Sequence, residues 1–258
     1  MRWIDFEGKT VVVTGASGGI GRAVAQSFAD LGAKVFLLDR RGTGLDEPAE
    51  AIGGIGLECD VTDAAAIETV ADRIAQEGGA DILVNNAGIL KPAPLDELPI
   101  ADWQAMMAVN LDGCLRLAQI FGAQMMKKTA GSIVNVASIS ASQPQPFSGA
   151  YSPGKAALVM LSRQIAYEWG PKGIRCNVVS PGLVETPLSA SFYENGTVRS
   201  AREALVPTGR IGQPQDMADA VVFLASHRAS YINGQELVID GGLSQTLMGS
   251  VPRPGYSR

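Results

Sequence analysis

Residues 10–21 read Thr-Val-Val-Val-Thr-Gly-Ala-Ser-Gly-Gly-Ile-Gly. The β-branched run at 10–14 is typical of a strand buried on both faces of a parallel sheet. An amphipathic stretch follows the glycines, from Arg22 to Leu31. Glycines alone also occur in ordinary turns, but glycines between a strand and a helix let the backbone approach a ligand closely, and the helix N-terminus then offers free N–H groups to an anion. This context predicts a pyrophosphate-binding loop at residues 15–21.

A second strand, predicted over Lys34–Leu38, ends at Asp39. An acidic residue at about this distance from the glycine loop binds the ribose 2′-hydroxyl of NAD, and its charge repels the 2′-phosphate of NADP. Arg40 and Arg41 leave the opposite interpretation open, because a guanidinium can bind that phosphate. We favour NAD over NADP because Asp39 ends the strand, where its side chain is directed at the ribose.

Strand and helix patterns alternate along the whole chain. The predicted strands are 10–14, 34–38, 55–58, 81–85, 132–137, 174–179 and 236–239, and the predicted helices are 19–31, 63–77, 103–128, 151–169 and 214–226. This alternation predicts an α/β fold of Rossmann type: a doubly wound parallel sheet of about seven strands with helices on both faces. No internal repeat or linker interrupts it, so we expect one domain over residues 1–258. Ligands of such sheets bind at the carboxyl ends of the strands.

Three polar residues near the middle of the chain point to proton-transfer chemistry. Tyr151 and Lys155 are four residues apart and therefore share one face of a predicted helix, while Ser138 follows a predicted strand. An ammonium beside a phenol favours the phenolate, so we expect Lys155 to lower the pKa of Tyr151. A tyrosine of this kind can exchange a proton with an alcohol or a carbonyl. A tyrosine and a lysine at this spacing also occur on ordinary solvated helices. The catalytic interpretation therefore depends on the nucleotide-binding loop that precedes them in the sequence.

Together these residues resemble the short-chain dehydrogenase/reductase family, in the subfamily of about this length, from Gly8 to Leu243. Further matching motifs are Cys59-Asp60-Val61, Asn85-Asn86-Ala87-Gly88 and Pro181-Gly182 with Thr186. The resemblance implies that the dinucleotide is bound by Gly15, Ser17, Gly18, Gly19, Ile20, Gly21, Asp39, Arg40, Asp60, Val61, Asn86, Ala87, Gly88, Tyr151, Lys155, Pro181, Gly182, Val184 and Thr186. It also favours NAD, because many NADP-dependent members have a basic residue at the position of Gly18.

The resemblance further implies a catalytic tetrad of Asn110, Ser138, Tyr151 and Lys155. In that family the serine orients the reacting oxygen and the lysine also binds the nicotinamide ribose, while the asparagine holds a water that links the lysine to solvent. The sequence departs from the family pattern at Pro153 and Gly154, which stand between Tyr151 and Lys155. Proline is tolerated in the first helical turn, so we expect the helix to begin at Tyr151.

Composition excludes several other functions. The net charge is −5 with no long basic run, so we expect no nucleic-acid partner. No apolar run of membrane-spanning length and no signal-peptide core are present, and the three cysteines lack metal-ligand spacing, so we expect a cytoplasmic protein without a metal or a membrane association. His227, the only histidine, follows a predicted helix, which argues against a histidine relay or a zinc dehydrogenase site.

The substrate is the least defined feature of the sequence. Ser140, Gln145 and Phe147 precede Tyr151 and are candidate contacts for a hydroxylated substrate, although they also suit a solvated loop. By resemblance, residues 187–210 form a substrate lid, in which Arg199 and Arg202 could meet an anionic group. Residues 244–258 form a proline-containing tail that we expect to be extended. The family resemblance implies a homotetramer or a homodimer.

We therefore expect an NAD-dependent oxidoreductase that interconverts a secondary alcohol, such as a sugar or polyol, and its ketone or lactone. Reduction of a ketone or of a 3-oxoacyl thioester is the alternative activity. A regulatory protein that binds NAD without catalysis is the alternative of another class, although all four tetrad positions are filled.

Overall fold

The computed structural model describes residues 3–251 and residue 255, and all its strands belong to one parallel sheet. The strands are β1 (Thr10–Thr14), β2 (Lys34–Asp39), β3 (Ile55–Glu58), β4 (Ile82–Asn85), β5 (Gly131–Val136), β6 (Ile174–Pro181) and β7 (Glu236–Ile239). Their order across the sheet is β3-β2-β1-β4-β5-β6-β7. The chain reverses its direction of winding between β1 and β4, and this switch point is where ligands of such sheets bind. The predicted doubly wound fold is confirmed.

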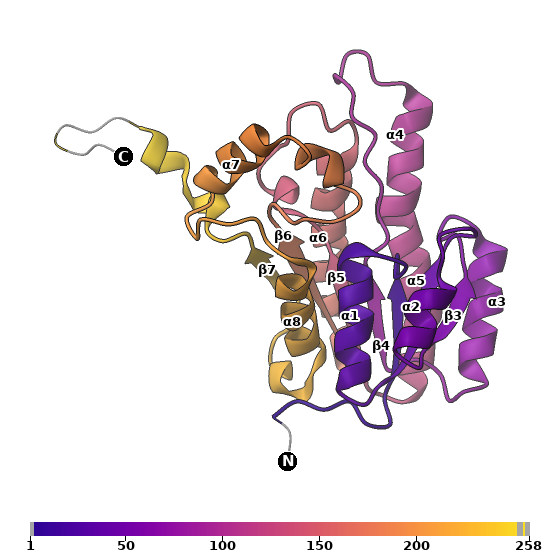
Figure 1. Ribbon diagram of the computed structural model, residues 1–258. Helices are drawn as coiled ribbons and strands as arrows, with labels where there is room; N and C mark the ends of the chain where they lie inside the picture. The colour runs from indigo at the N-terminus through magenta and orange to yellow at the C-terminus, as the bar shows by residue number, and fades with distance from the viewer. Residues whose placement is uncertain (1–2, 252–254, 256–258) are drawn as a thin grey trace.

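Helices cover both faces of the sheet (Figure 1). They are α1 (Gly19–Asp30), α2 (Asp46–Ala51), α3 (Ala64–Ala75), α4 (Ile100–Met107), α5 (Gly113–Lys127), α6 (Tyr151–Trp169), α7 (Gly196–Leu205) and α8 (Pro214–Ala225). The short α2 is absent from the sequence-based prediction because it has only six residues. The helix predicted over 103–128 is in fact two helices joined by a π-helical turn, η1 (Ala108–Asp112).

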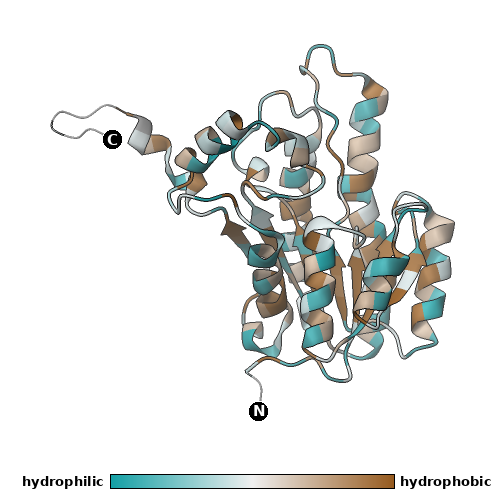
Figure 2. Ribbon diagram, in the orientation of Figure 1, coloured by the Kyte–Doolittle hydropathy of each residue, from teal (hydrophilic) through white to brown (hydrophobic). Residues whose placement is uncertain are grey.

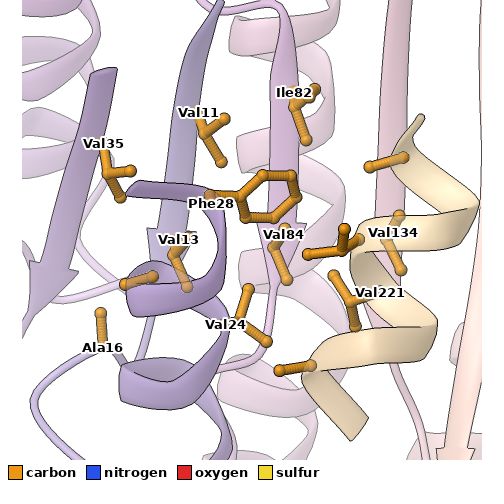
Figure 3. Packing of buried hydrophobic residues seen from close by; sticks show 14 of the residues in the cluster. Val11, Val13, Ala16, Val24, Phe28, Val35, Ile82, Val84, Val134 and Val221 are labelled. Carbon is orange, nitrogen blue, oxygen red and sulfur yellow. The ribbon is translucent and has the colours of Figure 1, made fainter. Parts of the chain in front are cut away.

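The alternation of side chains along each strand creates two separate cores. Val11 and Val13 of β1 face the side covered by α1, α2 and α8, whereas Val12 faces the side covered by α3, α5 and α6. Figure 3 shows the first core, in which Phe28 of α1 and Val221 of α8 pack on strand valines. Because both faces are covered, the central strands are mostly apolar, and the polar residues of the helices lie mostly on their outer sides (Figure 2).

The C-terminal segment differs from the sequence-based expectation. Two short 3-10 helices are formed by Leu243–Gln245 and Leu247–Ser250, so the described beginning of the tail is helical rather than extended. Pro252 and Pro254, on which the expectation rested, lie outside the described residues. His227 is exposed in the 3-10 turn that follows α8. No helix in the described part of the chain is both long and apolar enough to cross a membrane.

Candidate active site

A group of hydrogen bonds fixes the switch point between β1 and β4. The Thr14 hydroxyl accepts the backbone N–H groups of Asn86 and Ala87, each at 3.0 Å. The Asn86 amide in turn donates to the carbonyls of Thr14 and Gly15, at 3.0 and 3.1 Å. Two motifs that lie about seventy residues apart in the sequence are thus joined directly. The carboxyl ends of both strands are held rigidly at the place where a ligand of this fold binds.

The glycine loop is packed too closely for side chains. A Cβ atom on Gly21 would lie 2.1 Å from the Gly15 carbonyl oxygen and 2.6 Å from the Asn86 amide nitrogen. Gly15 itself has a φ of +63°, which favours glycine. Helix α1 begins at Gly19 without a side-chain cap, so no side chain accepts its first N–H groups. This helix N-terminus is therefore suited to a phosphate anion.

Asp39, at the end of β2, lies against the glycine loop. Its Oδ2 atom accepts hydrogen bonds from the Ser17 backbone at 3.0 Å and the Ser17 hydroxyl at 2.6 Å, and its Oδ1 atom accepts the Arg40 N–H at 2.8 Å. Asp60 is held similarly after β3, where hydrogen bonds from Thr62 lower the pKa of its carboxyl group despite partial burial. Two carboxylates therefore line this end of the site.

Lys155 is a buried cation at the centre of the site, with only 3% of its surface exposed. Its Nζ donates to the Val136 carbonyl at 2.8 Å and lies 5.7 Å from the centroid of the Tyr151 ring. Burial lowers the pKa of this ammonium group. A Cβ atom on Gly88 would come within 3.5 Å of Nζ, so glycine there leaves space beside the charge.

Tyr151 begins α6, as the sequence predicts, with Pro153 in the first helical turn. A hydrogen bond with Ser138 lowers the pKa of Tyr151, but burial has the larger effect and raises it. The expected lowering by Lys155 is therefore wrong for this structure, in which the Lys155 ammonium group is directed to the Val136 carbonyl. Ser138 and Tyr151 nevertheless lie together on the cavity wall, as a proton-transfer pair requires.

The π-helical turn η1 places Asn110 beneath the site, fully buried. Its side chain accepts the Ile89 N–H and donates to the Ile89 carbonyl, both at 2.9 Å. The side chain is therefore used to hold the segment after β4. The Cys114 thiol donates to the Asn110 backbone carbonyl at 3.6 Å. Such π turns are frequent at functional sites.

These groups surround one cavity of about 740 Å³ at the carboxyl ends of the strands. Every residue predicted to bind the dinucleotide lines it except Gly21, which packs beneath the loop. The cavity is also lined by Ser138, Tyr151 and Lys155, whereas Asn110 is not part of the lining. Among the described residues, no three His, Cys, Asp or Glu side chains are grouped so that they could hold a metal ion.

The substrate end of the cavity agrees with the sequence only in part. Ser140 and Gln145 line it and are hydrogen-bonded to each other at 3.1 Å. Phe147 does not line it: its side chain is 68% exposed, and its φ of +59° belongs to the loop before α6. Arg202 lines the cavity, and Arg199 does not.

Sequence reasoning missed the apolar lining. The missed residues include Ala105, Ala108, Val109 and Leu183, whereas Phe192 and Tyr193 belong to the predicted lid. The first three reach the cavity from α4 and η1, and an apolar helix residue gives no sequence signal that separates a cavity wall from a core.

Comparisons with known proteins match the chain along most of its length. A family model described as enoyl-(acyl carrier protein) reductase matches residues 15–244. The D-threitol dehydrogenase of Mycolicibacterium smegmatis is 41% identical over 93% of this chain and 95% of its own. A 3-oxoacyl-[acyl-carrier-protein] reductase of Escherichia coli is 39% identical over 93% of this chain and 99% of its own.

A solved structure is also similar. A protein from Beutenbergia cavernae, proposed to be an NAD(P)-dependent gluconate 5-dehydrogenase and containing NADP at low occupancy, superposes with a TM-score of 0.88. It is 38% identical, over 93% of this chain and 98% of its own. The fold and these matches thus define an oxidoreductase. The chain belongs to the short-chain dehydrogenase/reductase family.

Proposed function

We propose that the protein is an NAD-dependent dehydrogenase that interconverts a secondary alcohol of a sugar or polyol and the corresponding ketone or lactone. The observation that carries this proposal is the grouping of Ser138, Tyr151 and buried Lys155 on the wall of a cavity that the dinucleotide motifs also line. The D-threitol dehydrogenase relative acts, by its name, on a polyol. The hydroxyl and amide groups of Ser140 and Gln145 are suited to hydrogen-bond a hydroxylated substrate.

The residues present fit a nicotinamide dinucleotide. The open N-terminus of α1 is suited to its pyrophosphate, and Lys155, with a single hydrogen-bond acceptor among the described residues, keeps N–H groups available for the ribose hydroxyls. When bound, the dinucleotide supplies the hydride acceptor or donor. Asp39 supports NAD, because its carboxylate is fixed against Ser17 and would repel a 2′-phosphate. Arg40 lines the same end of the cavity, and the similar structure contains NADP, so both dinucleotides belong in the test.

The chain's own part in the reaction is to hold the alcohol and to move its proton. Ser138 donates a hydrogen bond that orients the substrate oxygen, and the Tyr151 oxygen takes the hydroxyl proton in oxidation or returns it in reduction. The Lys155 ammonium lies 5.7 Å from the centroid of the Tyr151 ring and so attracts the phenolate that forms, although burial disfavours that anion. Asn110 keeps the Ile89 segment, and thus one cavity wall, in place.

Reduction of a ketone or a 3-oxoacyl thioester is the second candidate activity. The E. coli relative carries this name, and the apolar residues Leu183, Leu188 and Phe192 of the cavity wall are suited to an acyl chain. A dinucleotide-binding protein without catalysis is the third.

One assay separates the three. Formation of NADH from NAD⁺ is measured at mildly alkaline pH with sugars, polyols and simple secondary alcohols, with NADP⁺ in parallel and Tyr151→Phe as the blank. Oxidation with NAD⁺ that disappears in the blank supports the proposal. Activity only with 3-oxoacyl thioesters in the reverse direction favours the second candidate, and dinucleotide binding without any turnover favours the third.

We also propose that the protein forms a homotetramer or a homodimer in the cytoplasm. Strand β7 lies at one edge of the sheet, and Leu237 and Val238 on it are each 38% exposed. The three cysteines are free and buried, which is compatible with a reducing compartment. Light scattering coupled to size exclusion measures the oligomeric state. A monomer at micromolar concentration would contradict the assembly proposal.

A further inference from the structure

Two arginines of α7 have opposite environments. Arg199 donates two hydrogen bonds to Glu185, at 3.1 and 2.8 Å, and a third to Glu203 at 3.2 Å. Its charge is therefore neutralised outside the cavity. Arg202 lines the cavity, and among the described residues no carboxylate forms an ion pair with it. One helix thus carries one arginine that holds the lid segment, residues 187–210, and one that faces the cavity.

Aromatic rings hold the Arg202 guanidinium in place. Its central carbon lies 4.7 Å from the centroid of the Phe192 ring and 5.3 Å from that of Tyr193, and both rings also line the cavity. The central carbon of Arg199 also lies near the Tyr193 ring, at 5.8 Å from its centroid. Stacking fixes the plane of a guanidinium while its edge remains available for hydrogen bonds. A hydrogen bond with the Tyr193 hydroxyl uses part of the Arg202 edge, and its remaining N–H groups can bind an anionic group.

The acidic groups that line the cavity lie at one end of it, where Arg40 also lies. Its two carboxylates, Asp39 and Asp60, follow β2 and β3, whereas the lid segment follows β6. Strands β2 and β6 are four places apart in the sheet, which is roughly 19 Å at the usual spacing of neighbouring strands. Ser138 follows β5, the neighbour of β6. Among the described residues, the lining at the reacting end therefore carries the cations Lys155 and Arg202 and no carboxylate.

The bound dinucleotide is the other possible source of an anion. Its pyrophosphate is expected at the N-terminus of α1, beside β1, where Gly18 and Gly19 pack against Thr186 and Pro187 at the start of the lid. Helix α7 lies further along the chain and crosses above β6 and β7 (Figure 1). The position of Arg202 is thus better matched to a group on the substrate than to the pyrophosphate.

We propose that Arg202 binds an anionic group of the substrate, so that the preferred substrate is a hydroxylated carboxylate or phosphate ester rather than a neutral polyol. This inference rests on the proposed function, and it assigns Arg202 as the residue that sets substrate specificity. The carboxylate or phosphate lies at the end of the molecule away from the oxidised carbon, and Ser138 and Tyr151 hold the reacting hydroxyl.

The test compares alditols of four to six carbons, the aldonates of the same carbon skeletons, and alditol phosphates. Wild type is measured beside Arg202→Met, Arg202→Lys and the matched control Arg199→Met. We expect the wild type to prefer either the aldonates or the alditol phosphates over the neutral alditols. Arg202→Met should lower kcat/KM for the anionic substrates about 10- to 100-fold, chiefly through KM, because a charge-assisted hydrogen bond is lost.

For the neutral alditols, kcat/KM should change less than about threefold in Arg202→Met. In Arg202→Lys, the loss of kcat/KM for the anionic substrates should be smaller than in Arg202→Met. In Arg199→Met, kcat/KM should change by the same factor for neutral and anionic substrates. Preference for aldonates or for phosphates separates the two anion types.

Binding supplies a readout that does not need turnover. Calorimetric titration of each compound into the NAD-loaded Tyr151→Phe protein, with and without Arg202→Met, should show an anion affinity that depends on Arg202. Equal affinity for neutral and anionic compounds overturns the inference and leaves the proposed function intact. A loss of NAD affinity in Arg202→Met, equal for all substrates, assigns Arg202 to the dinucleotide and also overturns it. Anion binding that depends on Arg202, without oxidation by the Tyr151-containing enzyme, contradicts the proposed function instead.

Discussion

The two ends of the cavity are held by different kinds of interaction. At the dinucleotide end, hydrogen bonds to backbone groups and close-packed glycines fix the geometry. Thr14 and Asn86 join β1 to β4, and Gly21 packs directly on Gly15. At the substrate end, side chains hold the lid segment: Arg199 forms an ion pair with Glu185, which precedes the lid, and Arg202 stacks on Phe192. The first arrangement tolerates few residue types at each position, whereas the second can be rebuilt with other side chains. A common cofactor site can thus serve different substrates.

The largest expected effect lies where the two ends meet. Tyr151→Phe removes the only group that we assign to proton transfer, so turnover should fall by about 10²- to 10⁴-fold or more. The ring and its packing remain, so NAD affinity, measured by fluorescence titration, should change little. Near-normal turnover in this variant would show that the proton-transfer assignment is wrong.

Gly21→Ala tests the rigidity of the dinucleotide end. The added Cβ would meet the Gly15 carbonyl oxygen at 2.1 Å, so the loop must shift. We expect a loss of about 3 kcal/mol in the free energy of unfolding, together with weaker NAD binding. Chemical denaturation with and without NAD measures both effects.

The matched control for Gly21→Ala is Gly196→Ala in the lid segment. A Cβ there meets nothing within 4 Å, at the first position of α7. Alanine should be neutral or stabilise by less than about 1 kcal/mol, because it favours the helix. If both substitutions lowered the free energy of unfolding equally, the dinucleotide end would be no more rigid than the substrate end, contrary to our interpretation.

Asp39→Asn tests the basis of dinucleotide choice within the rigid end. The change removes the negative charge beside Ser17 and keeps most of the shape, so the kcat/KM ratio of NADP to NAD should rise about 10- to 100-fold. Arg41→Ala is the control, since the Arg41 side chain is almost fully exposed and lies outside the cavity lining. An unchanged ratio in Asp39→Asn would assign the choice of dinucleotide to other residues, such as Arg40.

The difference between the two ends also explains how much the sequence could predict. At the dinucleotide end, close backbone packing requires glycine at Gly15 and Gly21, and Asp39 stands at the end of a recognisable buried strand, so a single sequence places Gly15 and Asp39 on one cavity. The position of Arg202 depends on its stacking on Phe192 and Tyr193, which the helical pattern of α7 does not encode. The π turn at Asn110 was missed for a similar reason, because its residues continue an ordinary helical pattern.

The same limit applies to electrostatics, where spacing alone gave the wrong sign. Four-residue spacing correctly placed Lys155 next to Tyr151, but it carried no information on burial, which raises the pKa of Tyr151 and lowers that of Lys155. Both shifts have the same cause, because removal of water disfavours the charged form of either group. The phenolate required for alcohol oxidation is therefore scarce in the free protein at neutral pH, and oxidation should accelerate as the pH rises.

The smallest expected effect is a shift of this pH dependence in Ser138→Ala. The hydrogen bond with Ser138 lowers the pKa of Tyr151, so its loss should move the rise in kcat/KM for alcohol oxidation to higher pH. The inflection of the profile, followed from about pH 8 to 11.5 because the pKa of Tyr151 is raised, reports this shift even when the overall rate falls. Ser140→Ala is the control, since the Ser140 hydroxyl is bonded to Gln145 instead. An unmoved or lowered profile in Ser138→Ala would mean that the serine orients the substrate without tuning the tyrosine.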